Sequence, residues 1–166
     1  RWSPEEGEAA FGVAGSVDRL SSEGKGALVR RTMIVSAVLD ALGLCKVPVL
    51  SIVGDYGLQN EAELVAGLTG RPITAAGLAL AGERIVNAEK LLDVRLGAGR
   101  EDDDLPDRFV EEPVPDAGAT HGMTVALPEM LRQFYTAMGW DEEGRPAPAK
   151  LRELGLDELP DPPALP

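Results

Sequence analysis

Apolar residues recur at helical spacing in two long stretches of the chain, and this repeat constrains the fold more than any other feature. In residues 24–42 and again in residues 75–96, they lie three, four or seven positions apart. Such a period places apolar side chains on one face of an α-helix. Gly43 follows the first stretch, and glycine often ends helices because it adopts left-handed backbone angles at little cost. The pattern predicts an all-α fold.

Shorter segments extend this to an irregular helical domain of about five helices with long connecting loops. The further helices are expected over residues 60–68, 128–138 and 147–154. Side-chain oxygens of Ser21 or Ser22, Asn60 and Thr74 are placed to cap helix starts, because they can accept a free backbone N–H.

The chain of 166 residues suits one domain. Residues 1–22 show no sustained period and are expected to be an irregular lead-in, with the helical domain over residues 23–157. The proline-rich residues 158–166 are expected to form a disordered tail. Residues 97–123 are long for a loop in a compact domain, so we expect them to cross the surface of another part of the protein.

Charge and cysteine content narrow the classes of partner and location. The formal net charge is −12, which disfavours nucleic acid and anionic membranes as partners. The single cysteine cannot form an internal disulfide, so a cytoplasmic location is expected. Only 4% of residues are aromatic against 44% hydrophobic, which predicts an aliphatic core. The chain begins with arginine and not methionine, which suggests a fragment or a processed product.

The segment DALGLC, residues 40–45, is the least ordinary stretch. Asp40 falls in the last turn of its predicted helix, where the helix dipole disfavours a carboxylate. Either Asp40 belongs to a solvated polar stripe with Thr32 and Ser36, or it is a partly buried carboxylate that binds a ligand N–H. Cys45 is a small buried hydrophobe, a catalytic thiol or a metal ligand.

Other candidate sites are weaker. A thiol nucleophile needs a base, and the single histidine, His121, lies far along the chain in a glycine-flanked loop. Cys45 and His121 cannot build a four-ligand metal site, so further ligands would have to come from elsewhere. The acidic run over residues 101–107 could bind a hard cation, but it lacks the spacing of a calcium loop. A solvated or partner-facing loop explains it more simply.

DALGLC also resembles the D-x-x-G-L-C motif near the C-terminal end of the aldehyde ferredoxin oxidoreductase family. These enzymes carry tungsten or molybdenum, two pterins and an iron–sulfur cluster. Three more segments are similar to the family in the same order, namely EGKGALV (23–29), GERIVNAEKLLDVRLGAGREDDDLPDRF (82–109) and FYTAMGWDEEGRPAPAKLRELGL (134–156). In the family a β-rich N-terminal domain holds the pterins and two largely helical domains cover it. This chain resembles the last of these domains.

The resemblance implies a role for each part of the motif. Cys45 would be the fourth ligand of a 4Fe–4S cluster whose other three cysteines lie in the middle domain. Asp40 would accept hydrogen bonds from the amino-pyrimidine edge of one tungstopterin or molybdopterin. Gly43 would let the backbone turn, and the backbone around Leu44 would also contact that pterin. A thiolate is the usual soft ligand for iron, and hydrogen bonds to a carboxylate are charge-assisted.

The implied partners are the N-terminal and middle domains of the same enzyme and ferredoxin, with homo-oligomerisation left open. The whole enzyme would oxidise an aldehyde to an acid, and this fragment alone should hold no cofactor and be inactive. The family often has aromatic residues where this chain has Val86, Ala88 and Leu92, which leaves the substrate open. Two competing hypotheses are a non-catalytic acidic helical interaction module with Cys45 in its core, and a small thiol enzyme that uses Cys45 and His121.

Overall fold

The computed structural model describes residues 3–11, 17–48 and 57–158. Apart from one isolated bridge, the regular structure in these ranges is helical, which confirms the predicted all-α class. Its elements in chain order are α1 (Pro4–Phe11), α2 (Lys25–Ala41), α3 (Gln59–Thr69), α4 (Ala75–Arg95), the 3-10 helix η2 (Arg100–Asp102), α5 (Asp107–Val110), α6 (Leu127–Met138) and α7 (Pro148–Leu154).

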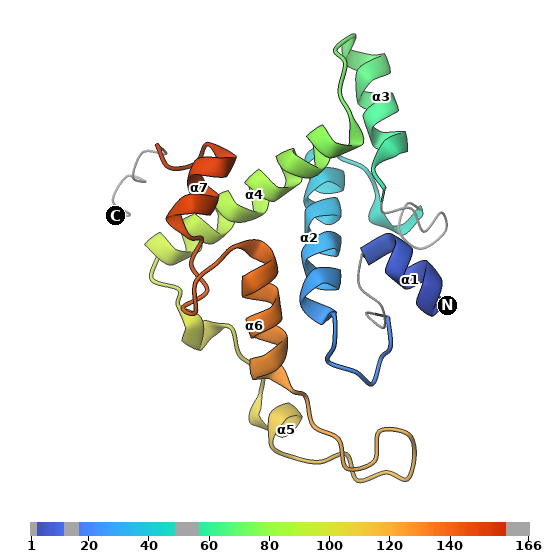
Figure 1. Ribbon diagram of the computed structural model, residues 1–166, viewed down its shortest axis with the longest axis vertical. Coiled ribbons are helices and arrows are strands. Elements are labelled where there is room, and N and C mark those ends of the chain that lie inside the picture. The colour runs from blue at the N-terminus through green and yellow to red at the C-terminus, as the bar shows by residue number, and fades with distance from the viewer. Residues whose placement is uncertain (1–2, 12–16, 49–56, 159–166) are drawn as a thin grey trace.

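Helix α2 lies at the centre and packs against both α4 and α6 (Figure 1). Glycines make both crossings close. A Cβ on Gly26 would lie 2.3 Å from the backbone carbonyl carbon of Gln133 in α6, and a Cβ on Gly82 would lie 2.5 Å from the carbonyl oxygen of Ile34 in α2. Both distances are far below van der Waals contact, so larger residues would force the helices apart.

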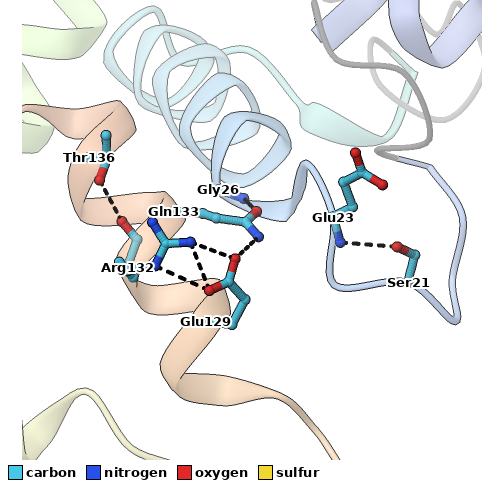
Figure 2. A network of polar contacts seen from close by, with 7 residues as sticks. All are labelled: Ser21, Glu23, Gly26, Glu129, Arg132, Gln133 and Thr136. Carbon is cyan, nitrogen blue, oxygen red and sulfur yellow. Dashed lines mark hydrogen bonds and ion pairs between the residues drawn. The ribbon is translucent and has the colours of Figure 1, made fainter.

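A network of polar contacts also joins the start of α2 to α6 (Figure 2). Glu129 accepts hydrogen bonds from Arg132 and from Gln133 within α6, at 2.8 and 2.9 Å. The side-chain oxygen of Gln133 accepts in turn from the backbone N–H of Gly26, at 3.5 Å. The glycine that allows the close crossing therefore also carries a contact between the two helices.

The main core is aliphatic, as the composition predicts. It gathers six buried residues from the C-terminal half of α2 and the first turns of α3 and α4, namely Val35, Val38, Leu39, Leu58, Ala62 and Leu78. Leu42 and Leu44, which lie on either side of Gly43, pack against this cluster. The chain that leaves α2 is thus anchored to the core before it reaches Cys45.

Most helix ends agree with the sequence. Glycines in the left-handed conformation follow α3, α6 and α7 at Gly70, Gly139 and Gly155, and the Thr74 hydroxyl accepts from the backbone N–H of Gly77 at 3.1 Å. The two other predicted caps, by Ser21 or Ser22 and by Asn60, are wrong. Helix α2 begins after Gly24 without a side-chain cap, and Asn60 lies inside α3 because that helix already begins at Gln59.

Helix α1 corrects the expected irregular lead-in. It begins with a capping box, in which the Ser3 N–H donates to the Glu6 carboxylate at 2.6 Å and the Glu6 N–H donates to the Ser3 hydroxyl at 3.2 Å. Pro4 occupies the first helical position, where its missing N–H costs nothing. The segment SPEE, residues 3–6, contains this capping box. A search for periodic apolar residues does not detect it, because the signal consists of polar residues at the helix start.

The structure also shows that the stretch 97–123 is not structureless, since it contains η2 and α5. Helix α5 and the loop that follows it extend from one end of the molecule, while α3 and the start of α4 extend from the other (Figure 1). Residues 159–166 of the expected tail lie outside the described residues. The domain boundaries at residues 22 and 157 remain predictions.

Candidate functional site

The candidate site is the turn that ends α2. The Gly43 N–H donates to the carbonyl of Asp40 at 3.0 Å, and the Leu44 N–H donates to the carbonyl of Leu39 at 2.9 Å. These are the two hydrogen bonds of a Schellman motif, with Gly43 at φ 68° as its left-handed residue. Leu44 also packs against the core that contains Leu39. The turn that carries Cys45 is therefore held by backbone hydrogen bonds and by packing.

Asp40 points outward from this turn. Its side chain is 62% exposed and forms an ion pair with Lys46, whose Nζ lies 2.6 Å from Oδ2. Of the two alternatives for Asp40, partial burial is therefore wrong, because the α2 face that carries it is turned away from the core. Thr32 and Ser36 on the same stripe are half-buried. Sequence reasoning missed Lys46. The available signal was a lysine six residues after Asp40, with Gly43 between them as a residue that turns the chain back.

Cys45 is exposed. The interpretation of this thiol as a small buried hydrophobe is wrong, and the hypothesis of an interaction module with Cys45 in its core loses its support. The hypothesis of a small thiol enzyme that uses Cys45 and His121 is not supported either. His121 belongs to the loop after α5, which lies beyond the N-terminal end of α2, whereas Cys45 follows the C-terminal end (Figure 1). The structure does not bring the imidazole to the thiol.

The acidic run beginning at Glu101 does not form a cation site. Asp103 accepts a hydrogen bond from the Tyr135 hydroxyl at 2.6 Å and pairs with Lys90 at 3.2 Å, so it anchors the loop to α4 and α6. Asp102 accepts from the backbone N–H of Gly99 at 2.8 Å. Over the described ranges, no three His, Cys, Asp or Glu side chains are grouped so that they could hold a metal ion. For Asp103, the partner-facing interpretation is wrong.

Two partly buried groups away from the turn have shifted pKa values. Burial raises the pKa of Tyr135, and the hydrogen bond and charge of Asp103 raise it further, so its hydroxyl stays a donor. For Lys150, burial lowers the pKa, but contacts with Glu153 and Glu83 outweigh it and the net shift is upward. Both groups hold helices together, and neither belongs to the candidate site.

A groove runs between α2 and α4 beside Asp40, with a volume of about 410 Å³. It is lined by Met33, Ser36, Ala37, Asp40 and Ala41 from α2 and by Ile85, Val86 and Glu89 from α4. The lining is mostly apolar, and its two carboxylates are exposed. The turn with Cys45 thus lies at one end of an open, largely apolar face.

None of the described helices combines the length and the apolar composition that crossing a membrane requires. Fold and site together define a helical domain that presents a carboxylate and a thiol on one rigid surface turn. Residues 2–156 match a protein family described as "Aldehyde ferredoxin oxidoreductase, domains 2 & 3". The chain therefore belongs to the aldehyde ferredoxin oxidoreductase family, and the predicted family is confirmed.

Individual relatives agree with this assignment. The chain is 37% identical over 126 residues to the tungsten-containing aldehyde ferredoxin oxidoreductase of Pyrococcus horikoshii and 38% identical over 126 residues to that of Pyrococcus furiosus. It is 31% identical over 134 residues to the aliphatic sulfonate oxidoreductase, WOR-like subunit, of Pyrococcus furiosus. Each match covers 75% of this chain but only 20% of the relative. The chain spans about a fifth of the length of these curated relatives.

The turn fits the cofactors that the family implies. Cys45 offers one exposed thiol, which can bond to iron held by other ligands outside this chain. A Cβ placed on Gly43 would meet no atom of the described residues within 4 Å, so there is open space beside the backbone of the turn. Asp40 provides an exposed acceptor next to that space.

Proposed function

We propose that this C-terminal domain completes the cofactor site of a tungsten- or molybdenum-dependent aldehyde:ferredoxin oxidoreductase. The observation that carries the proposal is the exposure of Asp40 and Cys45 on one rigid turn. A domain that used these groups for its own stability would bury them or pair them within its core. A carboxylate and a thiol that bind cofactors held by another part of the enzyme must be exposed and must be held in a fixed position.

Cys45 is assigned as the fourth ligand of a 4Fe–4S cluster, with three cysteines supplied by the preceding part of the enzyme. Thiolate is the usual ligand of iron in such clusters. The Schellman turn supports this role because it fixes the backbone two residues before the sulfur. The cluster, when bound, supplies one-electron transfer, so the full enzyme can pass electrons singly to ferredoxin.

Asp40 is assigned to the amino-pyrimidine edge of one pterin, where its carboxylate accepts charge-assisted N–H bonds. The ion pair with Lys46 does not oppose this role. Exposed ion pairs contribute only about 0–1 kcal/mol, so the carboxylate can share or exchange this partner at little cost. Gly43 and the backbone at Leu44 would lie against the same pterin, because the space beside the turn is open.

For the whole enzyme we propose oxidation of an aldehyde to a carboxylic acid, in which water supplies the added oxygen atom, two electrons pass to ferredoxin and two protons are released. The metal centre, when bound, supplies this two-electron chemistry, while Asp40 positions the pterin and Cys45 holds the acceptor cluster beside it. The relatives named as tungsten-containing enzymes favour tungstopterin over molybdopterin. The isolated domain is inactive in this proposal, because it supplies one cluster ligand only. A cytoplasmic location also belongs to the proposal.

Substitutions in the full-length protein test the two assignments separately. In Cys45→Ser the EPR signal of the reduced cluster should be lost or altered and the iron content should fall, whereas the control Ala76→Ser, at an exposed residue outside the groove, should leave both unchanged. Asp40→Asn replaces one carboxylate oxygen by an N–H donor, so pterin content should fall while iron is retained. An unchanged cluster signal in Cys45→Ser would reject the ligand role.

A further inference from the structure

We infer that the groove between α2 and α4 is the surface on which the preceding part of the same polypeptide docks. This inference rests on the proposed function and adds to it the location of a domain interface. The groove belongs to a larger apolar face. Val29, Met33, Ala37 and Ala41 follow one another at intervals of four along α2. Ile85 and Leu92 are seven residues apart in α4, and Leu96 follows four residues later, directly after the helix ends. These spacings keep each set on one side of its helix.

Several of these side chains are unusually exposed. Met33 is 37% exposed, Leu92 46% and Leu96 55%. Single exposed apolar residues are ordinary, but several that share a side of two adjacent helices indicate an interaction surface, here with Glu89 as a charged residue between Ile85 and Leu92. Elsewhere on α4, Glu83 and Asn87 are buried and bonded to other elements of the domain. The apolar face lies on a side of α4 that does not carry these two buried residues.

The position of Asp40 identifies what covers this face. Asp40 lines one end of the groove, and Cys45 follows five residues later. Their proposed partners, a pterin and the other three cluster ligands, must be carried by polypeptide outside this chain. That polypeptide has to contact the end of α2 to reach both groups, and contact there continues directly onto the groove. The relatives are long enough to supply it, since the chain spans only 20% of their length.

Charge argues against a second copy of this chain as the occupant. Asp40 and Glu89 both lie on the groove, and each copy carries a formal net charge of −12. Pairing two such faces would bring like charges together at the interface and repel the two domains as a whole. The matching surface should instead be apolar, with a lysine or arginine opposite Glu89.

Thiol labelling of the full-length enzyme tests this inference. Single cysteines are introduced at two exposed residues of the groove by Met33→Cys and by Ala41→Cys, and the control is Ala76→Cys, at an exposed alanine of α4. Ala76 lies nine residues before Ile85, which places it on the opposite side of the helix. Maleimide labelling of the native enzyme is followed at each site by mass spectrometry. Docking predicts labelling at Met33→Cys and Ala41→Cys that is at least about tenfold slower than at the control, because modification must wait for local opening.

Met33 is the decisive probe, because it lies two turns of α2 away from Asp40 and is not shielded by a cofactor bound there. Labelling of both groove variants at the rate of the control would overturn the inference. Protection that disappears on dilution would also overturn it, since it would show that a second copy covers the groove. The readout does not depend on the cluster. If Cys45→Ser leaves the cluster unchanged while Met33→Cys is protected, the ligand assignment fails and the docking face stands.

Discussion

Removal of the Glu83 carboxylate should destabilise the domain strongly, although its ion-pair partners are Arg30 and Lys150 and not the residues of the proposed cofactor site. The side chain of Glu83 is 10% exposed and lies between two cations from other helices. Arg30 of α2 approaches it to 2.9 Å and Lys150 of α7 to 3.3 Å. Glu83→Ala leaves both cations without this partner and loosens the contacts of α4 with α2 and α7 at once.

The expected size of the effect follows from how well each cation can be solvated in the variant. Truncation of one partner of a buried ion pair costs about 3–5 kcal/mol. Arg30 is 32% exposed and regains water, and Lys150 keeps its contact with Glu153 at 2.9 Å. Both facts reduce the cost, so we expect a loss of about 2–3 kcal/mol in the free energy of unfolding.

Urea unfolding followed by far-UV circular dichroism measures this loss. Glu83→Gln is the matched control, because it keeps the volume and one acceptor oxygen but removes the charge, and its loss should be about half as large. A Glu83→Ala variant within about 0.5 kcal/mol of the unmodified chain would show that the carboxylate does not organise the three helices.

Three further predictions concern other contacts. Gly26→Ala should lower the free energy of unfolding by about 2 kcal/mol, because the new methyl group meets the backbone of Gln133. This cost exceeds the gain from alanine's better helix propensity. Equal stability of the two chains in urea would contradict the close crossing of α2 and α6. The free energy of unfolding should fall above about pH 10.4, because the pKa of Lys150 is higher in the folded chain than in the unfolded chain. The stabilisation is complete below the unfolded-state pKa and is lost as the pH rises through the folded-state pKa. If stability falls equally with pH in Lys150→Met and in the unmodified chain, this prediction is contradicted. Lys46→Met should change stability by less than about 1 kcal/mol, because its ion pair with Asp40 is exposed, and a larger loss in thermal unfolding would mean that the pair is structural.

Much of the helical framework could be predicted because its signals are local. The Thr74 cap and the glycines at positions 43, 70, 139 and 155 act through hydrogen bonds that span only a few residues. The capping box of α1 is equally local and could have been recognised from Ser3 and Glu6. Leu58 had no such signal, because a leucine with φ of 63° before α3 is not expected from its residue type.

The sequence by itself therefore determined the fold class, most helix ends, the turn after α2 and the family motif that it carries. The tertiary structure decided which side chains of that turn face outward, the pairing of Asp40 with Lys46, and the use of Asp103 as an internal anchor for Tyr135. Helix caps depend on neighbours within one or two turns, whereas exposure depends on which helices pack against a face. Those helices are far apart in the sequence, so only the folded chain shows the apolar face of α2 and α4 that remains open.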